Sequence, residues 1–278
     1  MTGGSRDETL YLVEIGMKEP QYIVCVDIGN THTTVGLARG SVLTACWDMA
    51  TDAASTRDEL AVKVKGLLGL EGIGLADIGA VVISSVVPAA LDCWRRMSRR
   101  HMGLEAMDLH KRAMEAVAIS YPRPHEVGTD RLVNAVAAWN RLKGPAIVVD
   151  LGTATTFDCI SARGEYLGGA IAPGMLSAMR CLSTSTARLP AVSLPDEPVS
   201  ALGQSTVSAI HSGLLHGFGA MVDGMTERLR AEFDTSATVL ATGGLAKVLY
   251  PYSSSVELVV EHLAMEGMLQ LYCNEGAG

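Results

Sequence analysis

Short apolar runs and polar, glycine-containing turns alternate along the chain, and two distant segments share one pattern. In the first, residues 23–31 form an apolar run that ends in Asp-Ile-Gly-Asn-Thr, and a β-prone run follows at 32–37. In the second, residues 147–155 form an apolar run with Asp-Leu-Gly-Thr at its end, and residues 156–160 follow. Each pattern predicts a β-hairpin with a polar turn. A repeat separated by nearly half the chain indicates two related lobes.

Strands and helices are mixed through the rest of the chain, which places the protein in the α/β class. We expect an N-terminal lobe at residues 21–143 and a C-terminal lobe at 144–278. The further predicted elements are a strand at 80–87 that Pro88 stops, a helix from about Ala89 to His101, a helix after Asp130, a glycine-rich stretch at 168–174, a helix at about 205–229, and a strand at 237–241 that breaks at Thr242-Gly243-Gly244 before another helix.

The start of the chain differs from the rest. Residues 1–20 are polar and weakly patterned, and the first clear strand begins only at Gln21. We interpret these residues as an N-terminal extension, either disordered or the result of a start codon assigned too early. Met17 is the alternative initiator in the second case.

Composition and charge exclude several classes of protein. With 48% hydrophobic and 19% charged residues, the chain is an ordinary folded protein. Its net charge of −8 argues against a nucleic-acid partner bound through the overall field. The basic cluster at 95–101 is interpreted as a solvated helix face.

The cysteines and the apolar runs indicate the compartment. Six cysteines are scattered without a CxxC pair, as expected for reduced thiols in the cytoplasm. No apolar run is long enough to cross a bilayer, and the start carries no signal-peptide pattern. We therefore expect a cytoplasmic protein with no membrane partner.

A strand that ends in Asp-x-Gly has a chemical use at a phosphate. Glycine lets backbone N–H groups approach the phosphate, and the aspartate can hold Mg²⁺ beside it. One copy alone is better explained as a simple turn. Two copies, followed by Gly243-Gly244 after a strand, resemble the phosphate-1, phosphate-2 and adenosine pattern of the actin, Hsp70 and sugar-kinase superfamily. That resemblance implies two duplicated ribonuclease-H-like lobes with a nucleotide cleft between them.

A third candidate is the segment Gly128-Thr129-Asp130-Arg131, which opens a helix. Thr129 or Asp130 could serve as the N-cap of that helix, near the positive end of its dipole. Alternatively, Asp130 accepts a proton from a substrate hydroxyl while Arg131 holds an anionic group. The two interpretations are compatible.

From about Tyr22 to Asn274 the sequence resembles type III pantothenate kinases. The matching motifs lie, in this order, at 27–31, 83–88, 126–135, 150–158, 164–174, 186–190 and 241–246. Each motif is modest alone, but their order and spacing are highly specific. The resemblance implies a homodimer that binds pantothenate and ATP and requires Mg²⁺ and a monovalent cation, K⁺ or NH₄⁺, with the pantothenate site near the subunit interface.

The resemblance also implies roles for single residues. Asp130 is the proton acceptor for the pantothenate hydroxyl, Asp27 the Mg²⁺ carboxylate and Asp150 the monovalent-cation ligand. Two positions near the substrate, Arg123 and Ser205, depart from a frequent Asn, which puts affinity rather than reaction type in question. The substrate-binding residues are Tyr121, Gly128, Thr129, Asp130, Arg131 and Thr206, and the ATP-binding residues are Asp27, Ile28, Gly29, Asn30, Thr31, His32, Thr33, Thr34, Thr153, Gly243 and Gly244.

The implied reaction is ATP-dependent phosphorylation of pantothenate to 4′-phosphopantothenate, the first step of coenzyme A biosynthesis. One alternative is a non-catalytic nucleotide-binding regulator of the Bvg accessory factor type, and another is a superfamily kinase that acts on a sugar or an acid. The presence of Asp27, Asp130, Arg131 and Asp150 favours catalysis over regulation. Tyr121 with the Gly128–Arg131 motif argues against the other kinase.

Overall fold

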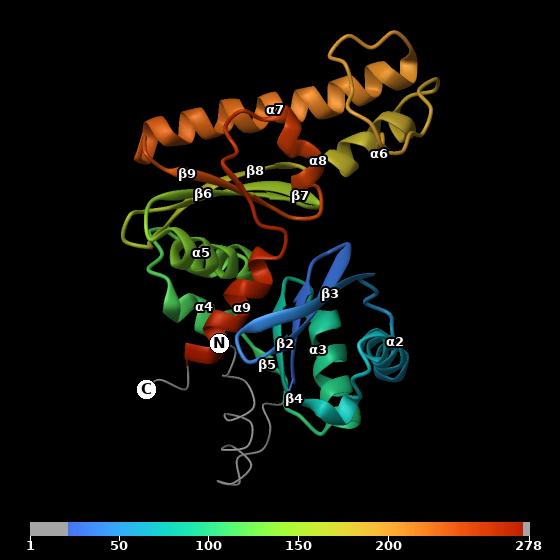
Figure 1. Cartoon of the computed structure of the whole chain (residues 1–278), viewed down its shortest axis with the longest axis vertical. Helices are drawn as coiled ribbons and strands as arrows, with labels where there is room; N and C mark the ends of the chain where they lie inside the picture. Colours follow the sequence, from blue (N-terminus) through green and yellow to red (C-terminus); the bar gives the residue numbers. More distant parts are fainter. Residues whose placement is uncertain (1–21, 275–278) are drawn as a thin grey trace, which may run out of the picture. The chain divides into compact units, whose positions relative to one another are not determined.

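The computed structural model describes residues 22–274, whose contacts divide the chain into two compact units (Figure 1). The first comprises residues 22–110 and 268–274, and the second comprises Lys111–Gly267. The extension predicted for residues 1–20 lies outside the described residues. The predicted lobes, 21–143 and 144–278, have different boundaries from these two units, and that division stays a prediction.

The first unit is built on one mixed five-stranded sheet. Its elements are β1 (Tyr22–Ile28), β2 (His32–Arg39), β3 (Val42–Ala50), α2 (Arg57–Leu70), β4 (Ile78–Ser85), α3 (Pro88–Met97) and β5 (Met107–Asp108). The strand order is β3-β2-β1-β4-β5. The pairs β1–β2 and β2–β3 are antiparallel, and β1–β4 and β4–β5 are parallel.

The second unit repeats this topology. Its elements are α5 (Thr129–Leu142), β6 (Ala146–Leu151), β7 (Ala154–Ile160), β8 (Tyr166–Pro173), α6 (Met175–Ser185), α7 (Thr206–Phe233), β9 (Thr238–Thr242), α8 (Ala246–Leu249) and β10 (Leu258–Val259). Helices α4 (His110–Ala116) and α9 (Leu263–Cys273) cross the boundaries between the units. The order β8-β7-β6-β9-β10 matches β3-β2-β1-β4-β5, with the same parallel and antiparallel pairs. The predicted duplication and the α/β class are therefore confirmed.

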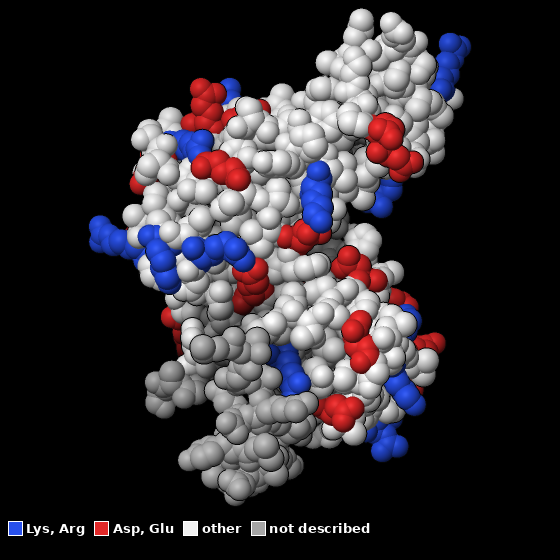
Figure 2. All heavy atoms as spheres, viewed as in Figure 1, with Lys and Arg blue, Asp and Glu red and all other residues white. Residues whose placement is uncertain are grey.

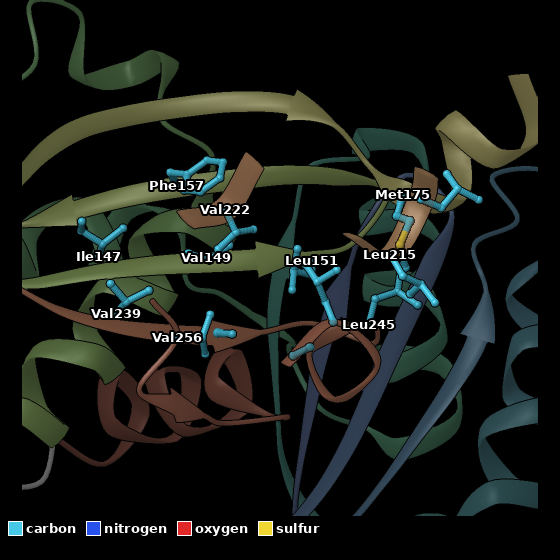
Figure 3. Packing of buried hydrophobic residues seen from close by; sticks show 14 of the residues in the cluster. Ile147, Val149, Leu151, Phe157, Met175, Leu215, Val222, Val239, Leu245 and Val256 are labelled. Carbon is cyan, nitrogen blue, oxygen red and sulfur yellow. The ribbon is translucent and has the colours of Figure 1, made fainter. Parts of the chain in front are cut away.

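Alternation along β6 and β7 gives the second sheet two different faces. Side chains in a strand point to opposite faces in turn. Ile147, Val149 and Leu151 of β6, with Phe157 of β7, enter the apolar core that α6, α7 and α8 complete (Figure 3). The residues between them, Asp150 and the aligned polar residues of β7, face the other way, toward α5. Figure 1 shows α7 and α5 on opposite sides of this sheet.

Most elements predicted from the sequence are confirmed within a few residues. The strand predicted at 80–87 is β4, and the helix predicted at 205–229 is α7, for which Ser205 is the N-cap. The helix predicted to end near His101 is α3, extended by one π-helical turn at Ser98–Met102. No helix within residues 22–274 combines the length and apolarity needed to span a membrane.

The basic cluster at 95–101 has exposed arginine side chains, as expected for a solvated helix face, and its charge is partly neutralised. Arg95 pairs with Asp108 at 3.0 Å, and Arg96 pairs with Asp92 at 3.0 Å. Arg99 pairs with Glu105. These exposed pairs contribute little to stability, but they leave the cluster with much less free positive charge than the sequence alone suggests.

A carboxylate near the middle of α7 organises the loop after α8. Asp223 accepts hydrogen bonds from the hydroxyls of Ser253, Ser254 and Ser255 at 2.6–2.8 Å, and from the backbone N–H groups of Ser254 and Ser255 at 3.0 Å. Burial opposes ionisation, but these hydrogen bonds outweigh it and hold the pKa of Asp223 well below its usual range.

We expect Asp223→Asn to lower the free energy of unfolding by about 1 kcal/mol at pH 7, given the partial exposure of the group. Because folding lowers this pKa, the stabilisation is complete above the unfolded pKa of about 4 and is lost as pH falls through the folded value. Urea unfolding should therefore show a difference in free energy of unfolding between the wild type and Asp223→Asn at pH 7, and a smaller difference at pH 3. The control Asp196→Asn, at an exposed position, should unfold with the wild-type free energy at both pH values. An equal loss of free energy of unfolding in Asp223→Asn at pH 7 and pH 3 would contradict the prediction.

Candidate active site

The first turn of α5 places two charged side chains next to each other. Gly128 is the N-cap residue and α5 begins at Thr129, so the predicted N-cap role of Thr129 or Asp130 is wrong. Asp130 lies within the first turn, where its Oδ1 accepts the Arg131 N–H at 2.9 Å. A carboxylate is favourable there because the first-turn N–H groups have no helical partners. Asp130 and Arg131 are thus held by the geometry of the helix start.

Arg131 reaches from α5 to a buried carboxylate on the sheet. Its Nε donates to Asp158 Oδ1 at 2.7 Å, and its Nη2 lies 2.6 Å from the same oxygen. Tyr166 Oη also donates to that oxygen at 2.8 Å, and Thr156 Oγ1 donates to Oδ2 at 3.2 Å. The Asp158 side chain is 0% exposed and that of Arg131 is 15% exposed. Sequence reasoning missed Asp158 and Tyr166 as site residues.

Asp150, the penultimate residue of β6, lies on the same face of the sheet. Asn134, one turn further along α5, donates from Nδ2 to Asp150 Oδ2 at 3.2 Å. Some of the surface of Asp150 still reaches solvent, but loss of hydration, followed by the charges of Asp130 and Asp158, raises the pKa of its carboxyl to about 7. A carboxylate so placed is stabilised by any cation that reaches it.

Two glycines allow close packing around the turn after Asp150. A Cβ on Gly243, which has a φ of +87°, would lie 2.5 Å from Asp150 Oδ1. A Cβ on Gly174 would lie 2.3 Å from the Thr153 carbonyl, which accepts the Gly174 N–H at 3.2 Å. Ser177 Oγ donates to the same carbonyl at 3.1 Å. The second Asp-x-Gly turn is therefore held from two sides, while Thr153 is exposed and Gly244 has open space around it.

Tyr121 lies against the strand that carries Tyr166. The chain at 118–120 pairs with Tyr166, because Tyr166 N donates to the Ala118 carbonyl at 2.8 Å and Ser120 N donates to the Tyr166 carbonyl at 2.9 Å. The ring of Tyr121 then covers Gly168, where a Cβ would lie 3.6 Å from it. Tyr121 is 38% exposed, so part of its ring is available to a ligand.

The first Asp-x-Gly loop belongs to the other unit and is supported by a residue that sequence reasoning missed. Gly29 N donates to the His32 carbonyl at 3.0 Å, closing the turn. Thr51, just after β3, donates from Oγ1 to the Gly29 carbonyl at 2.7 Å and lies 2.8 Å from Thr33 Oγ1. Its N–H also donates to the Thr31 carbonyl at 2.9 Å. Thr51 therefore stabilises the loop from outside the motif.

All the predicted substrate residues lie in the second unit, but they are not all on one face of its sheet. The Gly128–Arg131 turn and Asp150 lie on the α5 side of its sheet, and Tyr121 lies over Gly168 of the edge strand β8. Thr206 is the exposed first residue of α7, which covers the opposite face. The sequence did hold a signal for the missed Asp158. Thr156 and Asp158 alternate with apolar residues in β7, and a polar pair on a covered sheet face is unusual.

Chemically, the site combines a proton acceptor with an anion-binding group. Burial raises the pKa of Asp130, which the N–H and the charge of Arg131 oppose. A raised pKa makes a carboxylate a better general base near neutral pH. A guanidinium is suited to binding carboxylate or phosphate. The arrangement is suited to moving a proton from a hydroxyl of an anionic substrate.

Solved structures place the duplicated fold in a known class. A Baf family protein from Campylobacter jejuni is similar at a TM-score of 0.59 and 18% identity, covering 92% of this chain and 100% of that one. The activator of 2-hydroxyisocaproyl-CoA dehydratase from Clostridium difficile, solved with bound ADPNP, is similar at a TM-score of 0.53 and 14% identity, covering 92% and 95%. At such identities the likeness shows the fold alone, which is that of the actin, Hsp70 and sugar-kinase superfamily.

Within that class, the sequence comparisons define the family. The family model for type III pantothenate kinase matches residues 23–228. A type III pantothenate kinase of Desulfotalea psychrophila is 41% identical over 254 residues, covering 88% of this chain and 96% of the relative. The chain belongs to the type III pantothenate kinase family.

The two adjacent glycines after β9 provide a test of the packing around Asp150. We expect Gly243→Ala to lower the free energy of unfolding by roughly 2–4 kcal/mol, because it adds a Cβ at positive φ against Asp150 Oδ1. Gly244→Ala should cost less than about 0.5 kcal/mol, since its Cβ meets open space. Urea unfolding of both variants measures the difference. Similar losses in the two would refute the close packing.

Proposed function

We propose that this chain transfers the γ-phosphoryl group of ATP to the primary hydroxyl of pantothenate, giving 4′-phosphopantothenate for coenzyme A biosynthesis. The observation that carries the proposal is the adjacent Asp130 and Arg131 at the start of α5, in a chain that belongs to the type III pantothenate kinase family. The reaction needs a proton acceptor for the hydroxyl and a partner for the pantothenate carboxylate, and these two residues supply both.

Phosphoryl transfer depends mostly on positioning and on charge neutralisation. Asp130 accepts the hydroxyl proton as transfer proceeds, and Arg131 binds the substrate carboxylate. Tyr121, Gly128 and Thr129 line the pantothenate site beside them. The backbone and hydroxyls of residues 27–34, together with Thr153, Gly243 and Gly244, bind ATP. The closed Gly29 turn and the close packing at Gly243 support these assignments.

Mg²⁺ would enter as its complex with ATP. Within the described part of the chain, no group of three or more His, Cys, Asp or Glu side chains is arranged to hold a metal ion. Mg²⁺ commonly takes one or two protein carboxylates and completes its shell with phosphates and water. Asp27, where β1 enters the first Asp-x-Gly turn, fits that role. The ion supplies neutralisation of charge on the transferred phosphoryl group.

A monovalent cation, K⁺ or NH₄⁺, would be held by Asp150. The charges of Asp130 and Asp158 both act on Asp150, and the guanidinium of Arg131 pairs with Asp158. Such a cluster repels an anionic substrate unless a further positive charge or a proton balances it. The neighbouring Asn134 Oδ1 is buried and has no hydrogen-bond partner among the described residues, so an amide oxygen is present beside Asp150. These donors fit a cation with oxygen ligands.

A homodimer would complete the substrate site. Thr206 lies on the face of the second unit opposite Arg131, so a second copy of the chain is needed to bring a Thr206 to the substrate. The flanking Leu202 and Val207 are 75% and 43% exposed, which supports a covered surface around Thr206 in the working enzyme. All six cysteines are free thiols, as suits the cytoplasm.

A regulatory role of the Bvg accessory factor type is not favoured. The likeness to the Baf family protein extends to the fold alone at 18% identity. On the face shown in Figure 2, acidic and basic side chains are interspersed rather than gathered into a basic patch. Asp130 accepts the Arg131 N–H and its charge raises the pKa of Asp150, a grouping of ionisable side chains that favours catalysis over passive binding.

Replacing Asp130 by Asn should lower kcat by roughly 10²–10⁴-fold, because the amide cannot accept the hydroxyl proton. ADP release with ATP, Mg²⁺, K⁺ and pantothenate measures this, and wild-type kcat should fall as pH decreases through the raised pKa of Asp130. Asp196→Asn should keep wild-type activity. Absence of pantothenate-dependent turnover in the wild type under K⁺, NH₄⁺ and Na⁺ would refute the kinase, and full activity of Asp130→Asn would refute the base.

Replacing Asp150 by Asn should abolish the response to K⁺. We expect wild-type turnover to be roughly tenfold faster in K⁺ than in Na⁺, a typical coupling between two ligands. The variant should turn over at the same rate in both, because its side chain carries no charge for the ion. Titration of K⁺ at fixed ionic strength measures the response. A variant that keeps the wild-type K⁺ dependence would place the ion elsewhere.

A further inference from the structure

The guanidinium of Arg131 is anchored along one edge by Asp158 and lies over the ring of Tyr166. On the edge, Nε and Nη2 both contact Asp158 Oδ1, at 2.7 and 2.6 Å. The guanidinium carbon also lies over the Tyr166 ring, 5.6 Å from its centroid. Nη1 takes no part in the contact with Asp158. The contact with Asp158 therefore fixes the edge of the guanidinium that carries Nε and Nη2, and Nη1 can still donate to another anion.

The partner of Arg131 is itself fixed. Tyr166 Oη and Thr156 Oγ1 donate to the two oxygens of Asp158, at 2.8 and 3.2 Å, so the carboxylate cannot rotate without losing a hydrogen bond. Burial, and then the charge of Asp158, raises the pKa of Tyr166, so its phenol keeps the proton that it donates. Tyr166 is fully buried in β8. Arg131 is thus held by Asp158, and Asp158 is held by Tyr166 and Thr156.

Stability alone does not explain this arrangement. A buried ion pair recovers little more than the cost of removing its charges from water, and apolar residues of similar size often serve stability as well or better. A preorganised binding group, by contrast, loses less conformational entropy when its ligand arrives. Asp158 is 0% exposed on a sheet whose opposite face holds an apolar core, so its charge has a use other than packing.

We infer that Asp158 and Tyr166 are positioning residues that fix Arg131 for the carboxylate of the substrate. The inference rests on the proposed function, in which Arg131 binds pantothenate. Neither residue touches the reacting atoms, and both act through the guanidinium. Positioning and simple neutralisation predict opposite results. If Asp158 only cancelled the charge of Arg131, its removal would tighten anion binding, whereas loss of an anchor weakens it.

The kinetic test compares Asp158→Asn and Tyr166→Phe with the wild type. We expect the KM for pantothenate to rise roughly 10–100-fold in Asp158→Asn and roughly 3–10-fold in Tyr166→Phe, which keeps the ring but loses one hydrogen bond. The KM for ATP should change less than about twofold, and kcat less than about threefold. Asp108→Asn breaks the exposed Arg95–Asp108 pair and is the matched control, with no change expected. An unchanged or lower KM for pantothenate in the folded variants would overturn the inference.

A second measurement does not depend on activity. The Nε–H of Arg131, identified in ¹⁵N NMR spectra by its loss in Arg131→Lys, should exchange slowly with water in the wild type and faster in Tyr166→Phe. If Asp158→Asn fails to fold, Tyr166→Phe decides the matter by both readouts. If turnover is normal but the Nε–H of Arg131 exchanges rapidly with water in the wild type, the positioning role of Asp158 and Tyr166 is refuted and the proposed function is not. A protected Nε–H without any pantothenate turnover would refute the proposed function, and the substrate role of the anchor with it.

Discussion

The alternation of side chains in β6 and β7 is the constraint on which the second unit depends. A strand presents successive residues to opposite faces, so one sheet can complete an apolar core and carry buried charge at the same time. Val149 and Phe157 pack under α7, while Asp150 and Asp158, on the same two strands, meet α5. A shift of register by one residue would place both carboxylates in the core, which would be prohibitively costly.

The charge of the α5 side explains the ionic requirements that we propose for the enzyme. Asp130 and Asp158 both lie close enough to Asp150 to raise its pKa, and Arg131 already pairs with Asp158. An anionic substrate can enter only if the excess negative charge is balanced. A proton does this in part, as the raised pKa of Asp150 indicates, and a bound monovalent cation would do it without removing the carboxylate.

The duplication preserves topology but not the means by which each loop is held. In the first unit, Thr51 secures the turn at Gly29 with side-chain and backbone hydrogen bonds. In the second, Gly174 and Gly243 allow backbone to pack directly against the turn after Asp150. The same β-hairpin, which we propose as a phosphate loop in both units, is therefore stabilised by residues from different elements.

The sequence by itself determined the α/β class, the duplicated hairpins and the family, because strand periodicity, Asp-x-Gly turns and ordered motifs are local features. It also indicated the Asp130–Arg131 pair, although it misplaced the N-cap, which is Gly128. Only the tertiary structure decided that Arg131 is held by Asp158 and Tyr166. It also placed Thr206 on the opposite face of the sheet. Those facts depend on which strands pair and which helix covers each face. The polar pair Thr156 and Asp158 in β7 marks that face as unusual, but no local pattern shows which residues it contacts.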